Sequence, residues 1–323
     1  MKALTRNGYG SPGIIHFKEV PKPQIAPDEI LIRVHCNTVS RTDCGILGGK
    51  PFIFRFFVGW PKPKNPILGS DFAGEVVEIG PSVKGYNIGD RIFGFNDEGL
   101  GSQAEYLNIK ADGPIMHIPS KNTYREAAAA SEGAHYALNF LRYLNLPKGK
   151  KVLLIGATGA IGSAAIQILR SRGIRVDAVG EGAYRDYWQD RGVESYWDYK
   201  TEDFRKSGKQ YAAVLDAVGK SNFFKCRKLL QKGGAYVSSE LGPFASNLWL
   251  ALIAPLMPLA FVKFPFPKDI PASLKEMQRL MAAGKFQALI DPVKLKPQDA
   301  EKAYHYACSG EKIGNLILDW DMD

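Results

Sequence analysis

Three glycines at a fixed spacing constrain this chain more than any other feature. Gly156, Gly159 and Gly162 follow an apolar run at 152–155 and open an amphipathic run that continues to Leu169. A strand, a tight turn and a helix in this order bring free backbone N–H groups and the positive end of a helix to one point, where a phosphate can bind. The pattern predicts a dinucleotide-binding turn; the alternative is a purely structural strand-to-helix turn.

The residues after this turn predict a parallel sheet. Short apolar runs at 175–179, 195–199, 212–217 and 234–239 alternate with helical or polar segments, which is typical of helices packed on both faces of a parallel sheet. Ligands of such sheets bind at the carboxyl ends of the strands. The candidate cofactor-binding residues are therefore Gly156, Thr158, Gly159, Ala160, Ile161, Gly162, Gly180, Glu181, Arg185, Tyr199, Val218 and Leu241.

The two ends of the chain have a different pattern. Many short strand-like runs separated by Pro and Gly precede residue 119, such as 29–36, 73–79 and 91–95. After residue 267 the pattern predicts a helix at 272–284, a strand at 288–293, a helix at 297–310 and a strand at 314–319. We expect a discontinuous, mainly β domain (1–118 and 268–323) and a nucleotide-binding domain (119–267).

Several motifs occur in a fixed order and give the chain a specific resemblance. They are GSDFAGEVVEIG at 69–80, GDRIFG at 89–94, GSQAEY at 101–106 and YACSGEKIGNLIL at 306–318. With the glycine turn, the chain resembles a zinc-independent quinone oxidoreductase of the medium-chain dehydrogenase/reductase superfamily over essentially its whole length. The resemblance implies an α/β protein with a GroES-like catalytic domain and a Rossmann nucleotide-binding domain, often dimeric.

The activity that this resemblance implies is metal-free, NAD(P)H-dependent reduction of quinones or α,β-unsaturated carbonyls by direct hydride transfer. Other interpretations are an alcohol dehydrogenase, an enoyl-thioester reductase, or a catalytically silent NADPH-binding structural or nucleic-acid-binding protein. The substrate is expected to be a small molecule. No nucleic-acid motif accompanies the basic residues, and the protein is expected to form a homodimer.

Zinc chemistry can be tested against residue types. By motif placement, the zinc-dependent relatives have ligands where this chain has Ser40, Ser70 and Ser131, and neutral hydroxyls are poor zinc ligands. The four cysteines contain no C-x-x-C pair. We therefore expect no metal; the alternative is a metal held by Asp43 and Asp71.

Three residues are the candidates for the chemical step, and all three follow from the resemblance. Ser40 stands where relatives usually have Asn and can donate one hydrogen bond to a developing oxyanion. Asp43 either acts on the substrate or orients the neighbouring backbone. Tyr136, with His135 beside it, follows Gly133 in the region that relatives place near the nicotinamide, although His135 is equally well explained as a packing residue.

The choice between NADP(H) and NAD(H) is contested within the sequence. Glu181 lies 19 positions after Gly162, where an acidic residue binds the ribose hydroxyls of NAD. Arg185 and Tyr199 favour a 2′-phosphate, as does the basic character of 119–267, which holds 21 Lys and Arg against 12 Asp and Glu and carries the net charge of +9. NADP(H) is predicted, with Arg185 and Tyr199 on the phosphate and Glu181 turned toward solvent; NAD(H) remains possible.

The remaining features concern the protein's surroundings. The scattered cysteines and the absence of a signal-like start predict a cytoplasmic protein whose cysteines are small buried residues without disulfides. The apolar run 248–262 is too short and too interrupted by Pro to span a bilayer, although peripheral contact is possible. The aromatic run 50–64 either favours a flat apolar acceptor or fills the core of its domain.

Overall fold

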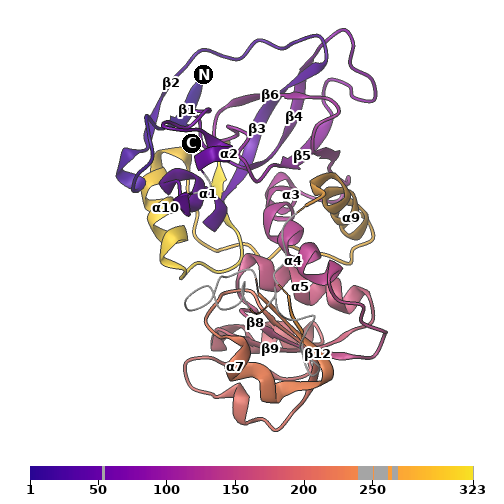
Figure 1. The fold of residues 1–323 in the computed structure, drawn as a ribbon. Coiled ribbons are helices and arrows are strands. Elements are labelled where there is room, and N and C mark those ends of the chain that lie inside the picture. The colour runs from indigo at the N-terminus through magenta and orange to yellow at the C-terminus, as the bar shows by residue number, and fades with distance from the viewer. Residues whose placement is uncertain (53–54, 239–249, 251–260, 264–267, 323) are drawn as a thin grey trace. The chain divides into compact units, whose positions relative to one another are not determined.

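The computed structural model describes residues 1–52, 55–238, 250, 261–263 and 268–322, and it consists of two compact units (Figure 1). Unit 1 comprises Met1–Glu132 and Asp269–Asp323, and unit 2 comprises Gly133–Lys268. Residues 119–132, which the sequence pattern placed with the nucleotide-binding segment, cluster with unit 1 because helix α3 (Tyr124–Ala129) packs on its sheet.

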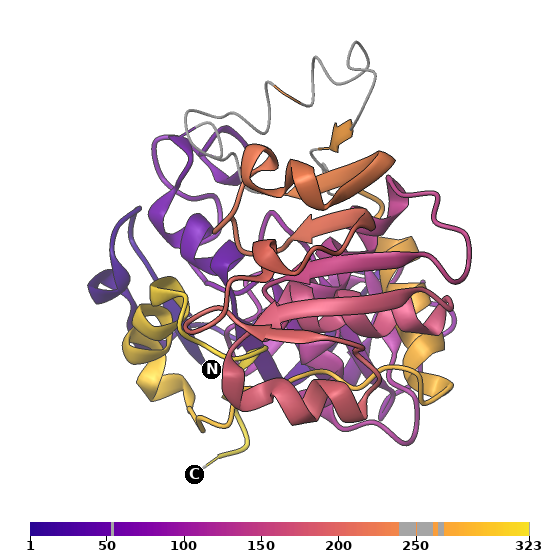
Figure 2. The same ribbon diagram turned by 90° about the horizontal axis from the view of Figure 1, so that it is seen from below.

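Unit 2 is built on a six-stranded sheet whose neighbouring strands are parallel, and Figure 2 shows these strands side by side. The order is β10-β9-β8-β11-β12-β13. The strands are β8 (Lys151–Ile155), β9 (Arg175–Gly180), β10 (Tyr196–Asp198), β11 (Tyr211–Asp216), β12 (Leu230–Ser238) and β13 (Phe261–Lys263). The four strands predicted between residues 175 and 239 are therefore present.

The centre of this sheet is buried on both faces. Val152, Leu153 and Leu154 of β8 are fully buried, which explains why this strand is a continuous apolar run without alternation. The α-helices with described bounds in unit 2 are α4 (Glu132–Arg142), α5 (Ala160–Ser171), α6 (Arg185–Asp190) and α7 (Phe223–Cys226). Helix α5 packs against β8 and β9, so the start of this helix is fixed at the carboxyl end of β8.

Unit 1 is mainly β, as predicted. Its larger sheet is antiparallel, in the order β14-β3-β4-β5-β7, with β6 paired to β3, and β1 and β2 form a separate ribbon. The strands are β1 (Lys2–Thr5), β2 (His16–Glu19), β3 (Glu29–Val39), β4 (Asp71–Ile79), β5 (Arg91–Phe95), β6 (Tyr106–Lys110), β7 (Ile115–His117) and β14 (Leu316–Asp319).

Helices from distant parts of the chain meet in unit 1. They are α1 (Arg41–Gly48), α2 (Arg55–Val58), α3, α9 (Ile270–Ala282) and α10 (Ala300–Ser309). Figure 1 shows α10 beside α1, and the two helices pack together with Leu47 and Tyr304 in a shared apolar core. The pairing of β14 with β3 completes this unit from the C-terminal end of the chain.

The apolar runs 288–293 and 248–262 have different outcomes in the structure. The predicted strand at 288–293 is wrong: only an isolated bridge from Ile290 to Asn315 forms there. Pro292 has no N–H, and the buried carboxylate of Asp291 accepts the N–H of Val293 at 2.9 Å, which turns the chain. The run 248–262 lies mostly outside the described residues, and among those described no helix has the length and apolarity to cross a bilayer.

Candidate dinucleotide and substrate sites

The turn between β8 and α5 exposes the start of a helix. The N–H groups of Gly156 and Ala157 donate to the carbonyl of Val179, which ties the turn to β9. Helix α5 then begins at Ala160, and the residue that caps it, Gly159, has no side chain to occupy its first N–H groups. An uncapped helix start that is held rigidly at a sheet edge is suited to bind an anion.

The three positions of the turn differ in why each of them holds glycine. Gly156 has a φ of +96°, which disfavours other residues. A Cβ on Gly162 would overlap the carbonyl oxygen of Gly156, so Gly162 is required for packing. Gly159 has neither restriction: its φ is −83°, and a Cβ there would lie 3.5 Å from its nearest neighbour, the carbonyl oxygen of Gly156. The open space at Gly159 therefore fits a ligand that approaches the backbone.

The end of β11 borders the same turn. The carboxylate of Asp216 is fully buried and accepts the N–H groups of Val218, Gly219 and Ser221 at 3.2, 2.8 and 3.0 Å. This holds Val218 against the turn, where its side chain would be the nearest neighbour of a Cβ on Gly156. The candidate residues Thr158, Ala160 and Ile161 complete the turn, whereas Leu241 lies outside the described residues.

The end of β9 brings Glu181 and Tyr199 together. The carboxylate of Glu181 accepts the hydroxyl of Tyr199 at 3.1 Å and the ammonium of Lys200 at 2.8 Å. Partial burial, followed by hydrogen bonding to Glu181, raises the pKa of the Tyr199 phenol, so this hydroxyl remains a donor. Sequence reasoning missed Lys200, whose only signal was its position directly after Tyr199.

Arg185 belongs to a neighbouring group of contacts. Its guanidinium forms an ion pair with Glu202 and donates to the carbonyl of Tyr196 at 2.7 Å. Gly180 is packed closely, because a Cβ there would overlap the Tyr196 hydroxyl. The structure therefore joins Glu181 with Tyr199, and Arg185 with Glu202, rather than Arg185 with Tyr199.

In unit 1, Ser40 and Asp43 form a reciprocal cap at the start of α1. The Asp43 carboxylate accepts both the N–H and the hydroxyl of Ser40 at 2.9 Å, and the Ser40 hydroxyl accepts the N–H of Asp43 at 3.1 Å. Both side chains are almost fully buried. The hydroxyl hydrogen of Ser40 is thus already used, and Asp43 orients the backbone as the sequence interpretation allowed.

Buried carboxylates surround this cap. Burial, and then repulsion from Glu132, raises the pKa of Asp43 to about 6, and one of its oxygens has no hydrogen-bond partner. Burial likewise raises the pKa of Asp71, which accepts the N–H of Thr38 at 2.7 Å. Glu132 accepts the hydroxyl of Thr42 at 2.6 Å. Asp43 and Asp71 therefore hold a proton more tightly than exposed carboxylates do.

The serines at the expected zinc-ligand positions do not fit zinc. Besides the engaged hydroxyl of Ser40, the hydroxyl of Ser131 donates to the carbonyl of Ala128 at 2.6 Å. Ser70 is fully buried and offers only a neutral hydroxyl. Within the described parts of the chain no group of three or more His, Cys, Asp or Glu could hold a metal ion.

Tyr136 lies on α4 in unit 2, whereas Ser40 and Asp43 lie in unit 1. The three candidate catalytic residues therefore stay a prediction as a set. His135 is fully buried beside Asn139, whose side chain donates to the His135 carbonyl at 2.9 Å. This burial favours the packing role for His135.

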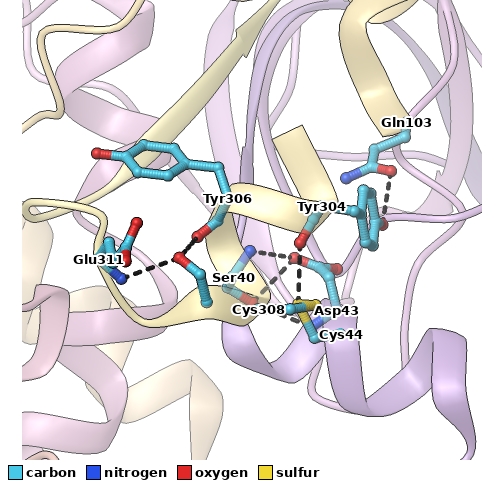
Figure 3. The surroundings of a disulfide bond; sticks show 9 residues. Ser40, Asp43, Cys44, Gln103, Tyr304, Tyr306, Cys308 and Glu311 are labelled. Carbon is cyan, nitrogen blue, oxygen red and sulfur yellow. Dashed lines mark hydrogen bonds between the residues drawn. A yellow bond between two sulfur atoms is a disulfide. The ribbon is translucent and has the colours of Figure 1, made fainter. Parts of the chain in front are cut away.

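A disulfide joins α1 to α10, directly after the cap (Figure 3). It connects Cys44, one residue after Asp43, to Cys308 near the end of α10, with a Cα–Cα distance of 6.1 Å. The expectation that all four cysteines are unpaired small residues is therefore wrong for these two. Cys36 and Cys226 are free and buried, as expected.

The aromatic run 50–64 does not fill the core of unit 1. Phe52, Phe56, Phe57 and Trp60 are all more than half exposed, whereas Val58 is buried. The core interpretation is wrong for these four exposed rings, and three of them, Phe52, Phe56 and Trp60, contact one another at the surface.

Comparisons with known proteins find family models in both parts of the chain. The family model "Alcohol dehydrogenase GroES-like domain" matches residues 26–120, and "Zinc-binding dehydrogenase" matches residues 191–318. A chloroplastic quinone-oxidoreductase (QR1) of Triphysaria versicolor is 27% identical over 99% of this chain and 98% of its own length. A 2-methylene-furan-3-one reductase of Solanum lycopersicum is 26% identical over 98% of this chain and 79% of its own length.

Solved structures share the whole fold. The quinone oxidoreductase from Coxiella burnetii has a TM-score of 0.84 at 24% identity and covers 99% of both chains. The Escherichia coli quinone oxidoreductase complexed with NADPH has a TM-score of 0.78 at 21% identity and covers 99% of this chain and 100% of its own. Fold and sites thus define a GroES-like domain combined with a Rossmann-type domain. The chain belongs to the medium-chain dehydrogenase/reductase superfamily of oxidoreductases and is quinone oxidoreductase-like.

Proposed function

We propose that this protein is an NADPH-dependent reductase of quinones or α,β-unsaturated carbonyls that works without a metal ion. The observation that carries the proposal is the open, uncapped start of α5 at Gly159, which has no packing or backbone reason to be glycine. The names of the two relatives above supply the acceptor class: a quinone in one and a conjugated ketone in the other.

The cofactor supplies a hydride to the acceptor when it is bound. The part of this chain is to bind and orient it: the turn 156–162 meets the pyrophosphate, and the residues at the end of β9 meet the adenosine ribose. We infer a preference for NADPH because Lys200 and the protonated Tyr199 flank Glu181. Both groups can donate hydrogen bonds to a 2′-phosphate in place of the Glu181 carboxylate.

The residues of unit 1 fit a role in substrate binding rather than metal binding. Burial raises the pKa values of Asp43 and Asp71, so both acids hold a proton more tightly than exposed carboxylates do, and hydroxyls replace the usual zinc ligands. Ser40, Asp43 and Tyr136 remain the proposed residues for orienting the acceptor and supplying a proton to it. A homodimer and a cytoplasmic location are further parts of the proposal, although the Cys44–Cys308 disulfide removes the argument for this location from unpaired cysteines.

An acceptor panel tests the function. The full-length protein is mixed with NADPH and, in separate reactions, a benzoquinone, an enone, an enoyl thioester and a saturated ketone, and NADPH oxidation is followed by absorbance. The proposal expects turnover with the quinone or the enone and little with the ketone. Exclusive use of the thioester or the ketone would instead assign an enoyl-thioester reductase or an alcohol dehydrogenase, and binding of NADPH without turnover would assign a silent binding protein.

A further inference from the structure

A group of exposed aromatic side chains lies on one loop of unit 1. We call the described residues 50–52 and 55–64 the aromatic loop. Phe52, Phe56, Phe57 and Trp60 are 54%, 63%, 55% and 55% exposed. Isolated exposed apolar residues are common, but several large rings that contact one another form a patch of the kind that marks an interaction site.

The loop presents these rings from a closed backbone. The N–H of Gly59 donates to the carbonyl of Arg55 at 2.8 Å, and the N–H of Lys64 donates to the carbonyl of Val58 at 2.9 Å. The Arg55 guanidinium donates to the carbonyl of Gly49 at 3.2 Å and stacks on the ring of Tyr9. A partner therefore meets an ordered surface, which lowers the entropic cost of binding.

Contacts among the rings give the patch its shape. The ring centroids of Phe52 and Trp60 are 5.1 Å apart, those of Phe52 and Phe56 are 6.0 Å apart, and those of Phe56 and Trp60 are 6.5 Å apart. Val58 is buried beneath the loop and anchors it. Three rings are therefore exposed as one cluster rather than as scattered residues.

The charged residues of the aromatic loop itself have a single sign, and Glu98 of a neighbouring loop lines the same pocket as Phe57 and Lys64. Between Asp43 and Asp71 the chain contains no Asp or Glu, but it contains Lys50, Arg55, Lys62 and Lys64. The three lysines are exposed. Aromatic rings flanked by cations match the two layers of an anionic membrane surface, where rings enter the boundary between headgroups and acyl chains and cations remain at the headgroups.

We propose that the aromatic loop docks unit 1 onto an anionic lipid bilayer. Phe56 and Trp60 enter the interfacial region, and Lys62 and Lys64 contact acidic headgroups. The docking is peripheral and electrostatically assisted, so it weakens as salt concentration rises. The proposal depends on the surface of unit 1 alone and stands whether or not the reductase activity is confirmed.

Vesicle co-sedimentation of the full-length protein tests this proposal. One set of vesicles is pure phosphatidylcholine, and the other contains about one part phosphatidylserine to two parts phosphatidylcholine. We expect partition into the anionic vesicles, reduced by salt. The Phe56→Ser/Trp60→Ser variant should bind at least about tenfold more weakly, because two inserted rings are lost. The Lys62→Gln/Lys64→Gln variant should lose about 30-fold on the anionic vesicles alone.

Matched controls locate the effect. Phe224→Ser removes a ring that is 57% exposed in unit 2, and Lys285→Gln/Lys302→Gln removes two exposed charges elsewhere in unit 1. Both controls should bind as the parent does. Equal losses in the controls would overturn the assignment to the loop, because binding would then follow overall charge or apolarity. All variants replace exposed side chains, so unchanged thermal unfolding verifies that each is folded.

Trp60 provides a second readout. The difference between the fluorescence of the parent and that of Trp60→Phe isolates the emission of this ring, and vesicles should shift it to shorter wavelength and allow quenching by brominated lipid. An unchanged spectrum in the presence of anionic vesicles would overturn the proposal. So would a dimer in sedimentation velocity that Phe56→Ser/Trp60→Ser abolishes without any vesicle binding, because the patch would then be a contact between two copies.

Discussion

The hydroxyl of Tyr199 lies 3.1 Å from the carboxylate of Glu181, which also accepts the ammonium of Lys200. The acidic side chain at the end of β9 is therefore held by two donors. NADH and NADPH use this arrangement differently: a ribose diol would share the carboxylate, whereas a 2′-phosphate would compete with it for Tyr199 and Lys200. The contact thus determines which substitutions change cofactor preference.

We predict that NADPH is used at least as well as NADH and that Lys200→Ala lowers kcat/KM selectively for NADPH, about tenfold or more, because a charge-assisted hydrogen bond is lost. Glu181→Gln should improve NADPH modestly by removing repulsion of the phosphate. Arg185→Ala is the matched control for the loss of a positive charge near this site, since Arg185 pairs with Glu202 and not with Glu181. A parent that strongly prefers NADH, and that Glu181→Gln alone switches to NADPH, would contradict this account.

The glycine turn gives a contrast between two substitutions. Gly159→Val should leave the protein folded and weaken NADPH binding at least about tenfold, because the added side chain occupies open space needed by the pyrophosphate. Gly162→Ala should instead destabilise the fold, since its Cβ overlaps the carbonyl oxygen of Gly156. Thermal unfolding and NADPH titration separate the two effects. A folded Gly159→Val protein with unchanged affinity would show that the turn does not bind the cofactor.

The raised pKa of Asp43 predicts a pH dependence of stability. With a pKa of about 6 in the folded protein against an ordinary 3.8, the folded state binds more protons between these values. The stabilisation is complete below about pH 3.8 and is lost as the pH rises through about 6, up to about 3 kcal/mol. Asp43→Asn, whose amide oxygen can still accept from Ser40, should remove this part of the slope in urea unfolding. Equal slopes for parent and variant would contradict the assignment.

The link between α1 and α10 is predicted to be chemically detectable. Of the four cysteines, two should react with a thiol reagent in denaturant without reductant, and all four after reduction. Cys308→Ser should lower the free energy of unfolding by about 2–5 kcal/mol, because the bridge closes a long loop of the unfolded chain. Cys226→Ser leaves the bridge intact and serves as the control for thiol counting. Four reactive thiols before reduction would rule out the bridge.

Local patterns predicted much of unit 2. The conformations of β8 and of the glycine turn depend on backbone and packing contacts within a few residues. The strand, the turn and α5 could therefore be predicted from the sequence. The relation between Gly156 and Gly162 belongs to the same local geometry. Lys200 could not be assigned a role this way, because its contact with Glu181 depends on how β9 and β10 pair in register.

Contacts between distant segments were the part that sequence could not predict. Cys44 and Cys308 are separated by 264 residues, and only the packing of α10 on α1 brings them together. The prediction of a strand at 288–293 was wrong for a related reason. The Asp291 carboxylate accepts the N–H of the distant Ile313 as well as that of Val293. The aromatic loop was ambiguous because composition alone does not distinguish a surface ring from a core ring.

Reduction that depends on NADPH and needs no metal ion can be measured on protein of known metal content. The full-length protein is dialysed against a strong chelator, shown by elemental analysis to lack zinc, and assayed for NADPH oxidation with a quinone and an enone. The account predicts unchanged turnover with at least one acceptor, because hydroxyls stand where zinc ligands would be. Loss of turnover that added zinc restores, with the fold intact, would contradict it.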